Sequence, residues 1–214
     1  MRKLVIGLMV ILMGCSSAEL VSTWKNPEIV IFDASKVLVV GMTSKKKAQQ
    51  NFETKMVQEF TQRNIEAMRS IDLFDVAFTE ASKSEAELDE VEEQLLDKDF
   101  DAILFTKVLG TENRESFSQK LAEIERSNER FKDDYMSHQD IYYDDDYYDQ
   151  YTVYLVETSL YCIGVGKERD LIWRGVIELT DPVVLNKTID QYIGLVVREM
   201  EDQELIFRQE EDIL

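Results

Sequence analysis

The hydrophobic positions of residues 36–210 alternate between continuous apolar runs and helix-like spacing. Val37 to Gly41 is a short run rich in β-branched residues, which is typical of a strand buried on both faces. From about Lys45 to Arg69, apolar residues recur every three or four positions and predict a helix. Runs at Phe74 to Phe78 and at Asp101 to Leu109 predict two more strands. This part of the chain therefore follows a strand–helix–strand order.

Two helix starts carry local signals. Ser84 and Glu87 have the spacing of a capping box, in which each side chain bonds the backbone N–H of the other residue. Near the end of the chain, Thr180 or Asp181 can cap a final helix, and Pro182 suits its first turn. A wide apolar stripe follows Pro182, so this helix should pack against a sheet.

The second half of the chain predicts an antiparallel hairpin. Its strands are expected at Thr152 to Val165 and at Leu171 to Leu179, with a glycine-containing turn between them. Trp173 is expected in the core. Arg174 and Glu178 are expected to face solvent, because they alternate with apolar residues.

Residues 114–149 have few aliphatic side chains and many charges. The stretch from Glu115 to Phe131 is charged and predicts a helix, and it leads into a dense block of Asp and Tyr residues. Low aliphatic content and like charge argue against a packed core. We expect a long, mobile, acidic, Tyr-rich loop between two strands.

Together these elements predict a single α/β domain over residues 36–210. The expected order is β-α-β-α-β, the loop, then β-β-α. A mixed sheet of about five strands with helices packed on it is the natural arrangement for this order.

The first 14 residues have the layout of a secretory signal. Arg2 and Lys3 precede an apolar run from Leu4 to Met13, which is too short to span a hydrocarbon core of roughly 30 Å. The run ends in Leu12, Met13 and Gly14, directly before Cys15. These four residues resemble the lipobox of bacterial lipoproteins, in which the cysteine is lipidated and becomes the first residue of the mature protein. The alternative is an ordinary secretory signal with a chance cysteine.

The lipobox resemblance also implies a location. An Asp directly after the lipidated cysteine tends to retain lipoproteins in the inner membrane, and this chain has Ser16 there. We therefore expect an outer-membrane lipoprotein whose body faces the periplasm. Residues 15–35 are expected to be the lipidated cysteine and a tether, and the folded domain is expected to start at Lys36.

Composition limits the partners. The chain has 43 acidic and 24 basic residues. Loss of Arg2 and Lys3 with the signal leaves 22 basic residues and a net charge near −21. Such a charge repels phosphate backbones and anionic lipids, so nucleic-acid binding is not expected and membrane contact should come through the lipid. If Cys15 is lipidated, Cys162 has no intramolecular disulfide partner.

Several short motifs resemble those of a group of small envelope lipoproteins. In this chain the motifs are Trp24, Val39-Val40-Gly41, Phe52-Glu53, the Tyr142 to Tyr151 region, Glu157-Thr158-Ser159-Leu160-Tyr161, Leu171-Ile172-Trp173-Arg174-Gly175 and Asp181-Pro182. The predicted element order is similar to the α/β domain of the curli-secretion lipoprotein CsgG, the penicillin-binding-protein activator LpoB and the N-terminal domain of TolB. The resemblance implies an anticodon-binding-like, TolB N-terminal type of fold.

The residues offer little that predicts catalysis or a cofactor. His138 is the only histidine, and no triad or zinc-ligand pattern surrounds it. Residues 41–47 follow a strand and open a helix, but they lack the second glycine and the Gly-Lys-Ser/Thr ending of a phosphate loop. Residues 144–149 could offer oxygens to Ca²⁺, but they lack the glycine and the closing glutamate of an EF-hand loop. We therefore expect neither a metal nor a cofactor.

The Tyr-rich loop is the candidate for protein contact. Tyr142, Tyr143, Tyr147 and Tyr148 could supply large contact area with polar tips, although a solvated loop is the plainer interpretation. The leading hypothesis is a non-catalytic interaction or assembly component of the envelope, with a protein partner or a second copy of itself. The alternative is a periplasmic ligand-binding protein or a cell-wall-acting enzyme.

Overall fold

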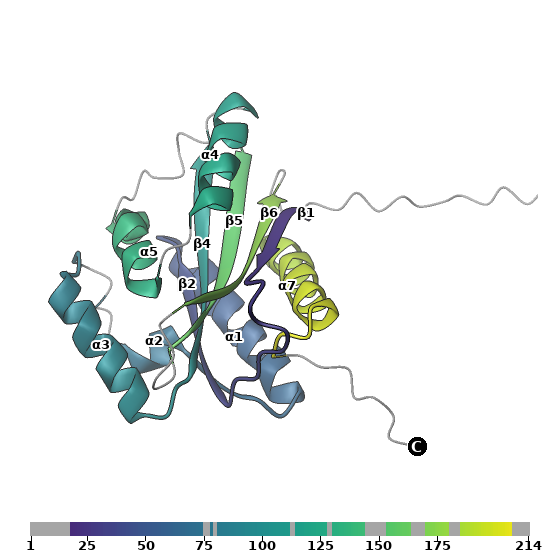
Figure 1. Ribbon diagram of the computed structural model, residues 1–214. Coiled ribbons are helices and arrows are strands. Elements are labelled where there is room, and N and C mark those ends of the chain that lie inside the picture. Colours follow the sequence, from purple (N-terminus) through teal and green to yellow (C-terminus); the bar gives the residue numbers. More distant parts are fainter. Residues whose placement is uncertain are drawn as a thin grey trace, which may run out of the picture.

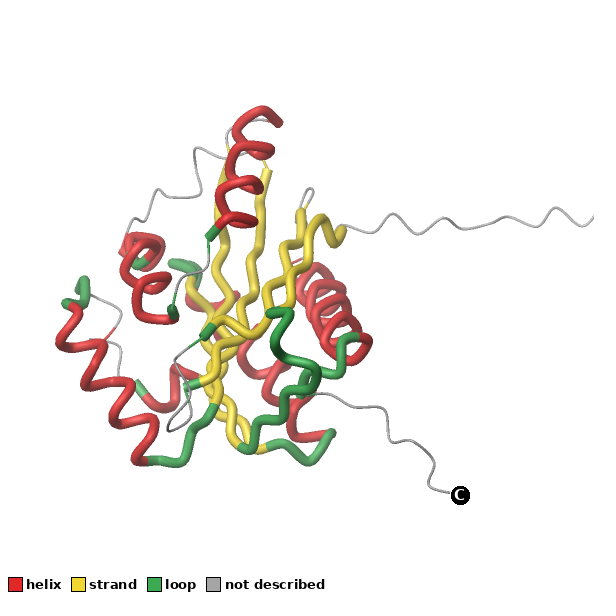
Figure 2. The backbone as a smooth tube through the Cα atoms, viewed as in Figure 1, coloured by secondary structure: helices red, strands yellow, loops and turns green. Residues whose placement is uncertain are grey.

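The computed structural model describes residues 18–74, 78, 81–111, 114–127, 130–143, 153–163, 170–179 and 185–206. Figures 1 and 2 show these residues as one sheet covered by helices on both faces. The lipobox residues Leu12, Met13, Gly14 and Cys15 lie outside the described residues.

Within the described residues, six strands form one mixed sheet in the order β1-β6-β5-β4-β2-β3. The strands are β1 (Ala18–Lys25), β2 (Lys36–Met42), β3 (Glu66–Arg69), β4 (Ala102–Thr111), β5 (Val153–Cys162) and β6 (Leu171–Leu179). Strand β2 is parallel to both β3 and β4, whereas the pairs β4–β5, β5–β6 and β6–β1 are antiparallel. The sheet thus has a parallel half and an antiparallel half.

Helices cover both faces of the sheet (Figure 1). They are α1 (Lys46–Gln62), α2 (Ser70–Leu73), α3 (Glu85–Asp97), α4 (Arg114–Arg126), α5 (Phe131–His138), α6 (Asp140–Tyr143) and α7 (Leu185–Asp202). Apolar side chains of α1 and α7 pack in one core with β1, β2, β4, β5 and β6. Side chains of α3, α4 and α5 pack in a second core on the opposite face. The side chains on both faces of the central strands are therefore mostly buried.

The predicted α/β class and much of the element order are confirmed. Strand β6 has the predicted bounds, β5 and β6 form the predicted antiparallel hairpin, and Trp173 is fully buried. The capping box also forms, because Ser84 Oγ accepts from the Glu87 N–H while Glu87 accepts from the Ser84 N–H.

The prediction that residues 15–35 are a tether is wrong for Ala18–Lys25. This segment is β1, an edge strand whose residues pair with β6 from Ala18 opposite Leu179 to Lys25 opposite Trp173. It was missed because its sequence mixes polar and apolar residues and lacks a continuous apolar run. The strand adds a sixth member to a sheet expected to have about five.

The second predicted strand is also placed differently. Helix α1 ends at Gln62 and not near Arg69, because Asn64 takes a left-handed conformation with a φ of 60° and the chain turns there. Strand β3 follows at once as Glu66–Arg69. Of the stretch Phe74 to Phe78, which was expected to be this strand, residues 75–77 lie outside the described residues.

The expectation of a mobile loop over residues 114–149 is wrong for most of that range. The described part of it forms α4, α5 and α6, which pack on the sheet through Phe117, Ile124, Phe131, Tyr135 and Ile141. These five aromatic and aliphatic residues bury enough apolar surface to order short helices in spite of the surrounding charge. Residues 144–149 are outside the described residues.

Candidate functional site

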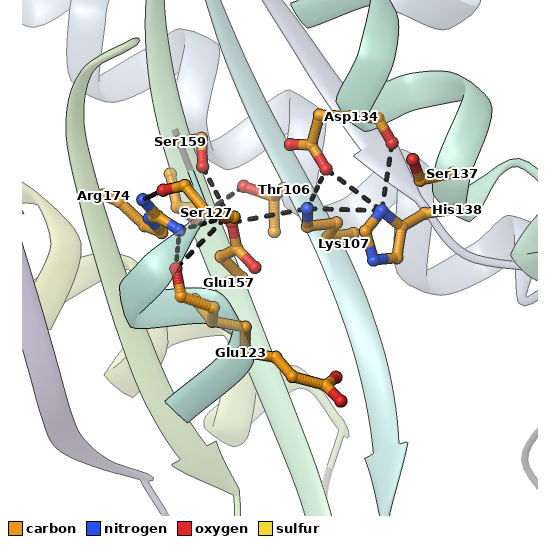
Figure 3. A network of polar contacts seen from close by, with 12 residues as sticks. Thr106, Lys107, Glu123, Ser127, Asp134, Ser137, His138, Glu157, Ser159 and Arg174 are labelled. Carbon is orange, nitrogen blue, oxygen red and sulfur yellow. Dashed lines mark hydrogen bonds and ion pairs between the residues drawn. The ribbon is translucent and has the colours of Figure 1, made fainter. Parts of the chain in front are cut away.

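A cluster of charged side chains lies buried between the sheet and helices α4 and α5 (Figure 3). Its centre is Lys107 on β4. The neighbouring side chains on the same face of this strand are apolar, namely Ile103, Phe105 and Leu109. The side chain of Lys107 is only 3 % exposed. In the register of the sheet, Lys107 faces Glu157 on β5, and its Nζ lies 3.3 Å from Glu157 Oε1. The cluster therefore begins as a cross-strand ion pair in an apolar layer.

Asp134 adds a second carboxylate from α5. Lys107 Nζ donates to Asp134 Oδ1, and the Tyr161 hydroxyl donates to Asp134 Oδ2 at 2.6 Å. Burial alone would raise the pKa of Asp134, but the charge of Lys107 and the contact with His138 outweigh it and hold that pKa well below its usual range. The pKa of Tyr161 is raised by its burial and by the negative charge of Asp134. Asp134 is thus an ionised acceptor whose two oxygens both have donors.

His138 forms the outer end of the cluster. It lies one helical turn after Asp134 on α5, and its side chain is 20 % exposed. Its Nδ1 lies 3.0 Å from both the backbone oxygen and Oδ1 of Asp134. Because both of these atoms are acceptors, we assign a hydrogen to Nδ1. His138 therefore helps to orient the Asp134 carboxylate.

Arg174 on β6 holds the end of α4. It is buried, and its guanidinium donates to Ile124 O, to Ser127 O at 2.6 Å and to Ser127 Oγ at 2.7 Å. The last carbonyls of a helix lack intrahelical partners, so a cation at this place satisfies them. The expectation that Arg174 and Glu178 face solvent is wrong, because both side chains are buried, Arg174 beneath the end of α4.

The geometry of this cluster suits a structural role better than proton transfer. Two cations, Lys107 and Arg174, accompany two carboxylates, Asp134 and Glu157, so these four buried charges balance. A general base needs a pKa near the working pH, whereas the pKa of Asp134 is shifted far below it. The cluster fixes α4 and α5 on the sheet at defined positions.

Another buried carboxylate, that of Glu53, lies on the opposite side of the sheet, beside the parallel strands. Glu53 on α1 is fully buried and accepts from Gly41 N, Gln49 Nε2 and Ser70 Oγ through Oε1, at distances from 2.7 to 3.1 Å. Its Oε2 accepts from Ile71 N. Burial raises the pKa of Glu53 in spite of these four donors. Glu53 therefore links the end of β2 to the start of α2.

A cavity of about 730 Å³ lies between β2 and helices α1, α2, α3 and α5. Leu38, Val40 and Val91 give it an apolar wall. At the carboxyl end of β3, Arg69 bonds both oxygens of Asp72 at 2.6 and 2.7 Å and contributes a polar wall. Ligand sites in proteins commonly have volumes of about 300–1,000 Å³. This cavity has the size and mixed lining of a small-molecule site.

A second and smaller cavity, of about 260 Å³, lies on the opposite face of the sheet. It is lined by residues of β2, β4, β5 and β6 and by residues near the starts of α1 and α7. Its lining is mostly apolar, including Ala48, Phe52, Val156, Leu179 and Ile189. Thr106 and Tyr192 also line it, and the hydroxyls of both bond the hydroxyl of Thr158.

The residues predicted for partner contact are placed differently from expectation. Tyr142 is half-buried on α6 and packs against the second core, with its ring centroid 6.3 Å from that of Tyr135. Tyr143 donates its hydroxyl to Ala81 O at 2.8 Å. Tyr147 and Tyr148 lie outside the described residues. The structure therefore gives Tyr142 and Tyr143 partners within the domain.

The buried charge cluster was missed at the sequence level. A signal for it exists, because each of the three neighbouring core strands carries at least one charged residue among apolar ones, including Lys107, Glu157 and Arg174. Only the register of the sheet shows that Lys107 and Glu157 lie opposite each other. The cavities have no comparable signal, since their linings come from distant segments.

No protein-family model matches this chain, and no curated protein matches it either. Among the helices that the structure describes, none is both long and apolar enough to cross a membrane. In the described parts of the chain, no group of three or more His, Cys, Asp or Glu residues is arranged to hold a metal ion.

Proposed function

We propose that this chain is a lipoprotein of the bacterial outer membrane, anchored through Cys15, and that its domain is a non-catalytic interaction or assembly component of the envelope. The observation that carries the proposal is the position of β1, which starts at Ala18, only three residues after Cys15. Three residues span at most about 11 Å. A lipid on Cys15 would therefore hold the edge of the sheet directly at the membrane surface.

The buried charges support a non-catalytic role. Lys107, Asp134 and Glu157 are each at most 4 % exposed in their side chains and contact one another. Both oxygens of Asp134 accept hydrogen bonds from the protein itself. Lys107, Asp134 and Glu157 therefore bond within the core, which favours a role in holding the helices on the sheet.

The far end of β1 supports an interaction role. An eight-residue strand is about 25 Å long, so Lys25 lies well away from the anchored end. Beyond Lys25, the large apolar side chains of Val30 and Ile31 are 73 % and 49 % exposed. In the described sheet β1 pairs only with β6, so its outer edge is open to another strand. We infer that the partner surface comprises this edge together with Val30 and Ile31.

Site-specific photocrosslinking in intact envelopes tests this surface. A photoreactive residue at Ile31 should give a discrete crosslinked product, either a heterocomplex or a dimer of this chain. The same residue at Ala86, which is exposed on α3, serves as the matched control. The double variant Val30→Asp/Ile31→Asp should reduce crosslinking from a photoreactive residue at Thr23, which is exposed on β1. Equal products from positions 31 and 86, or no product at all, would contradict the proposed surface.

The 730 Å³ cavity favours a second candidate function, the binding of a small periplasmic ligand. Its polar wall includes Arg69, which also bonds Thr54 Oγ1 at 2.8 Å, so a ligand would meet ordered polar groups. Native mass spectrometry of the protein purified from its own envelope would detect a retained ligand. Replacing Val91 with Trp should then remove the ligand if it occupies this cavity.

A further inference from the structure

The smaller cavity lies at the end of the sheet where the chain enters the domain. Leu179 lines this cavity and is the residue of β6 that pairs with Ala18. Paired Cα atoms of antiparallel strands are about 5 Å apart. Ala18 itself is buried in the same core as Ile189 and Tyr192, which also line the cavity. The first described residue thus adjoins the cavity wall.

The lining of the cavity selects an apolar ligand. Its lining is mostly apolar, and of the polar side chains in it, Thr106 and Tyr192 already bond Thr158 while Gln49 bonds Glu53. A polar ligand entering the cavity would lose bonds to water and find few exposed partners. An unbranched hydrocarbon chain has no hydrogen bonds to lose on entering.

The dimensions of the cavity fit part of one acyl chain. One water molecule occupies about 30 Å³ in the liquid, and a methylene group occupies a similar volume. A cavity of 260 Å³ therefore holds about eight methylene groups. The acyl chains of one leaflet reach about 15 Å, half of the hydrocarbon thickness. From Cys15 to Leu179 the path is at most about 11 Å of chain plus one strand spacing of about 5 Å. Cys15 therefore lies within about 16 Å of Leu179, which is close to the reach of one acyl chain.

We propose that this cavity binds one acyl chain of the lipid carried by Cys15. The inference rests on the proposed lipid attachment. Covalent attachment holds this chain near the opening at high effective concentration, which favours it over the acyl chains of free phospholipids. The other acyl chains of the anchor stay in the bilayer, where two chains suffice for stable anchoring. The domain would then be fixed in one orientation at the membrane.

The test uses the full chain in its own bacterium, fed palmitic acid that carries a diazirine and a terminal alkyne. After illumination, the protein is purified through the alkyne, digested, and its crosslinked peptides are identified by mass spectrometry. We expect crosslinks between the acylated Cys15 peptide and peptides that contain Phe52 or Ile189. The Ala48→Trp variant, which fills the cavity from α1, should lose these crosslinks. Ala86→Trp, at an exposed position on α3, should keep them.

The possible outcomes separate the two proposals. Cavity peptides linked to an intact phospholipid would show that the cavity takes a bilayer lipid and would overturn the assignment to the anchor. An acylated Cys15 peptide without any cavity crosslink would overturn the cavity proposal while supporting the anchor. An unmodified Cys15 would contradict the anchor itself. If Ala48→Trp does not fold, as judged by its thermal melting, Ala48→Phe provides a smaller filling.

Discussion

Replacing Lys107 with methionine should lower the free energy of unfolding by about 3–5 kcal/mol at neutral pH, because it leaves buried carboxylates without their shared cation. Methionine preserves the length and the apolar stem of lysine, so packing changes little. The two carboxylates affected are Asp134 and Glu157, whose side chains are 3 % and 4 % exposed. The cost therefore comes from uncompensated buried charge and not from a cavity.

Urea unfolding followed by circular dichroism measures this loss. The slope of the unfolding free energy against urea concentration should be the same in both proteins. The matched control is Lys120→Met on α4, which removes an ion pair between Lys120 and Glu123. The side chains of these two residues are 34 % and 68 % exposed. Such surface pairs contribute about 0–1 kcal/mol. The triple variant Lys107→Met/Asp134→Asn/Glu157→Gln should recover much of the lost stability, because no unpaired charge is then left.

The pH dependence provides an independent check. In the wild type the pKa of Asp134 is lowered from 3.8, so its contribution to stability is present above that value and is lost as the pH falls through the folded-state pKa. In Lys107→Met, burial without the cation should raise this pKa, so protonation on acidification relieves the cost. The stability difference between the two proteins should therefore shrink as the pH falls from neutral to about 4. A Lys107→Met protein as stable as Lys120→Met at neutral pH would refute the reasoning.

Three further predictions concern other parts of the fold. A Cβ added at Gly175 would lie 2.5 Å from the Trp173 ring, so Gly175→Ala should cost about 1–3 kcal/mol and lower the melting temperature, with partial rescue by Trp173→Leu. The pKa of Glu53 is raised above 4.5, so its contribution to stability is present below that pH and is lost as the pH rises through the folded-state pKa. The wild type should therefore gain stability relative to Glu53→Gln on acidification from neutral pH. Parallel stability profiles of the two proteins would contradict this. Ser84→Ala should cost about 0.5–2 kcal/mol and speed amide exchange in the first turn of α3, whereas unchanged exchange there would count against a working cap.

The elements that could be predicted from the sequence are those with a strong local signal. Strand β6 is rich in apolar residues on both sides of Arg174, and α3 has a capping box in which Ser84 and Glu87 bond each other. Strand β1 has no such signal, because its identity as a strand depends on pairing with β6. The short helices α5 and α6 were missed because a few buried side chains, such as Phe131 and Ile141, override an acidic composition.

The candidate site depended still more on tertiary structure. A charged residue within an apolar strand can face solvent at an edge or lie buried with a partner, and the sequence around Arg174 does not distinguish these cases. The structure decides between them, because Arg174 is buried and donates to Ile124 O in the last turn of α4 and to Ser127 O just after it. Asp134 was expected in a mobile loop, so its contact with Lys107 could not be foreseen.

The central claim is that Cys15 carries a lipid that holds the domain at the membrane. Mass spectrometry of the N-terminal peptide of the protein purified from native envelopes measures this directly. The account predicts a mature chain that begins at Cys15 and carries the mass of diacylglycerol and an N-linked acyl chain. A chain that retains residues 1–14, or one that is cut elsewhere and has an unmodified Cys15 thiol, would contradict it.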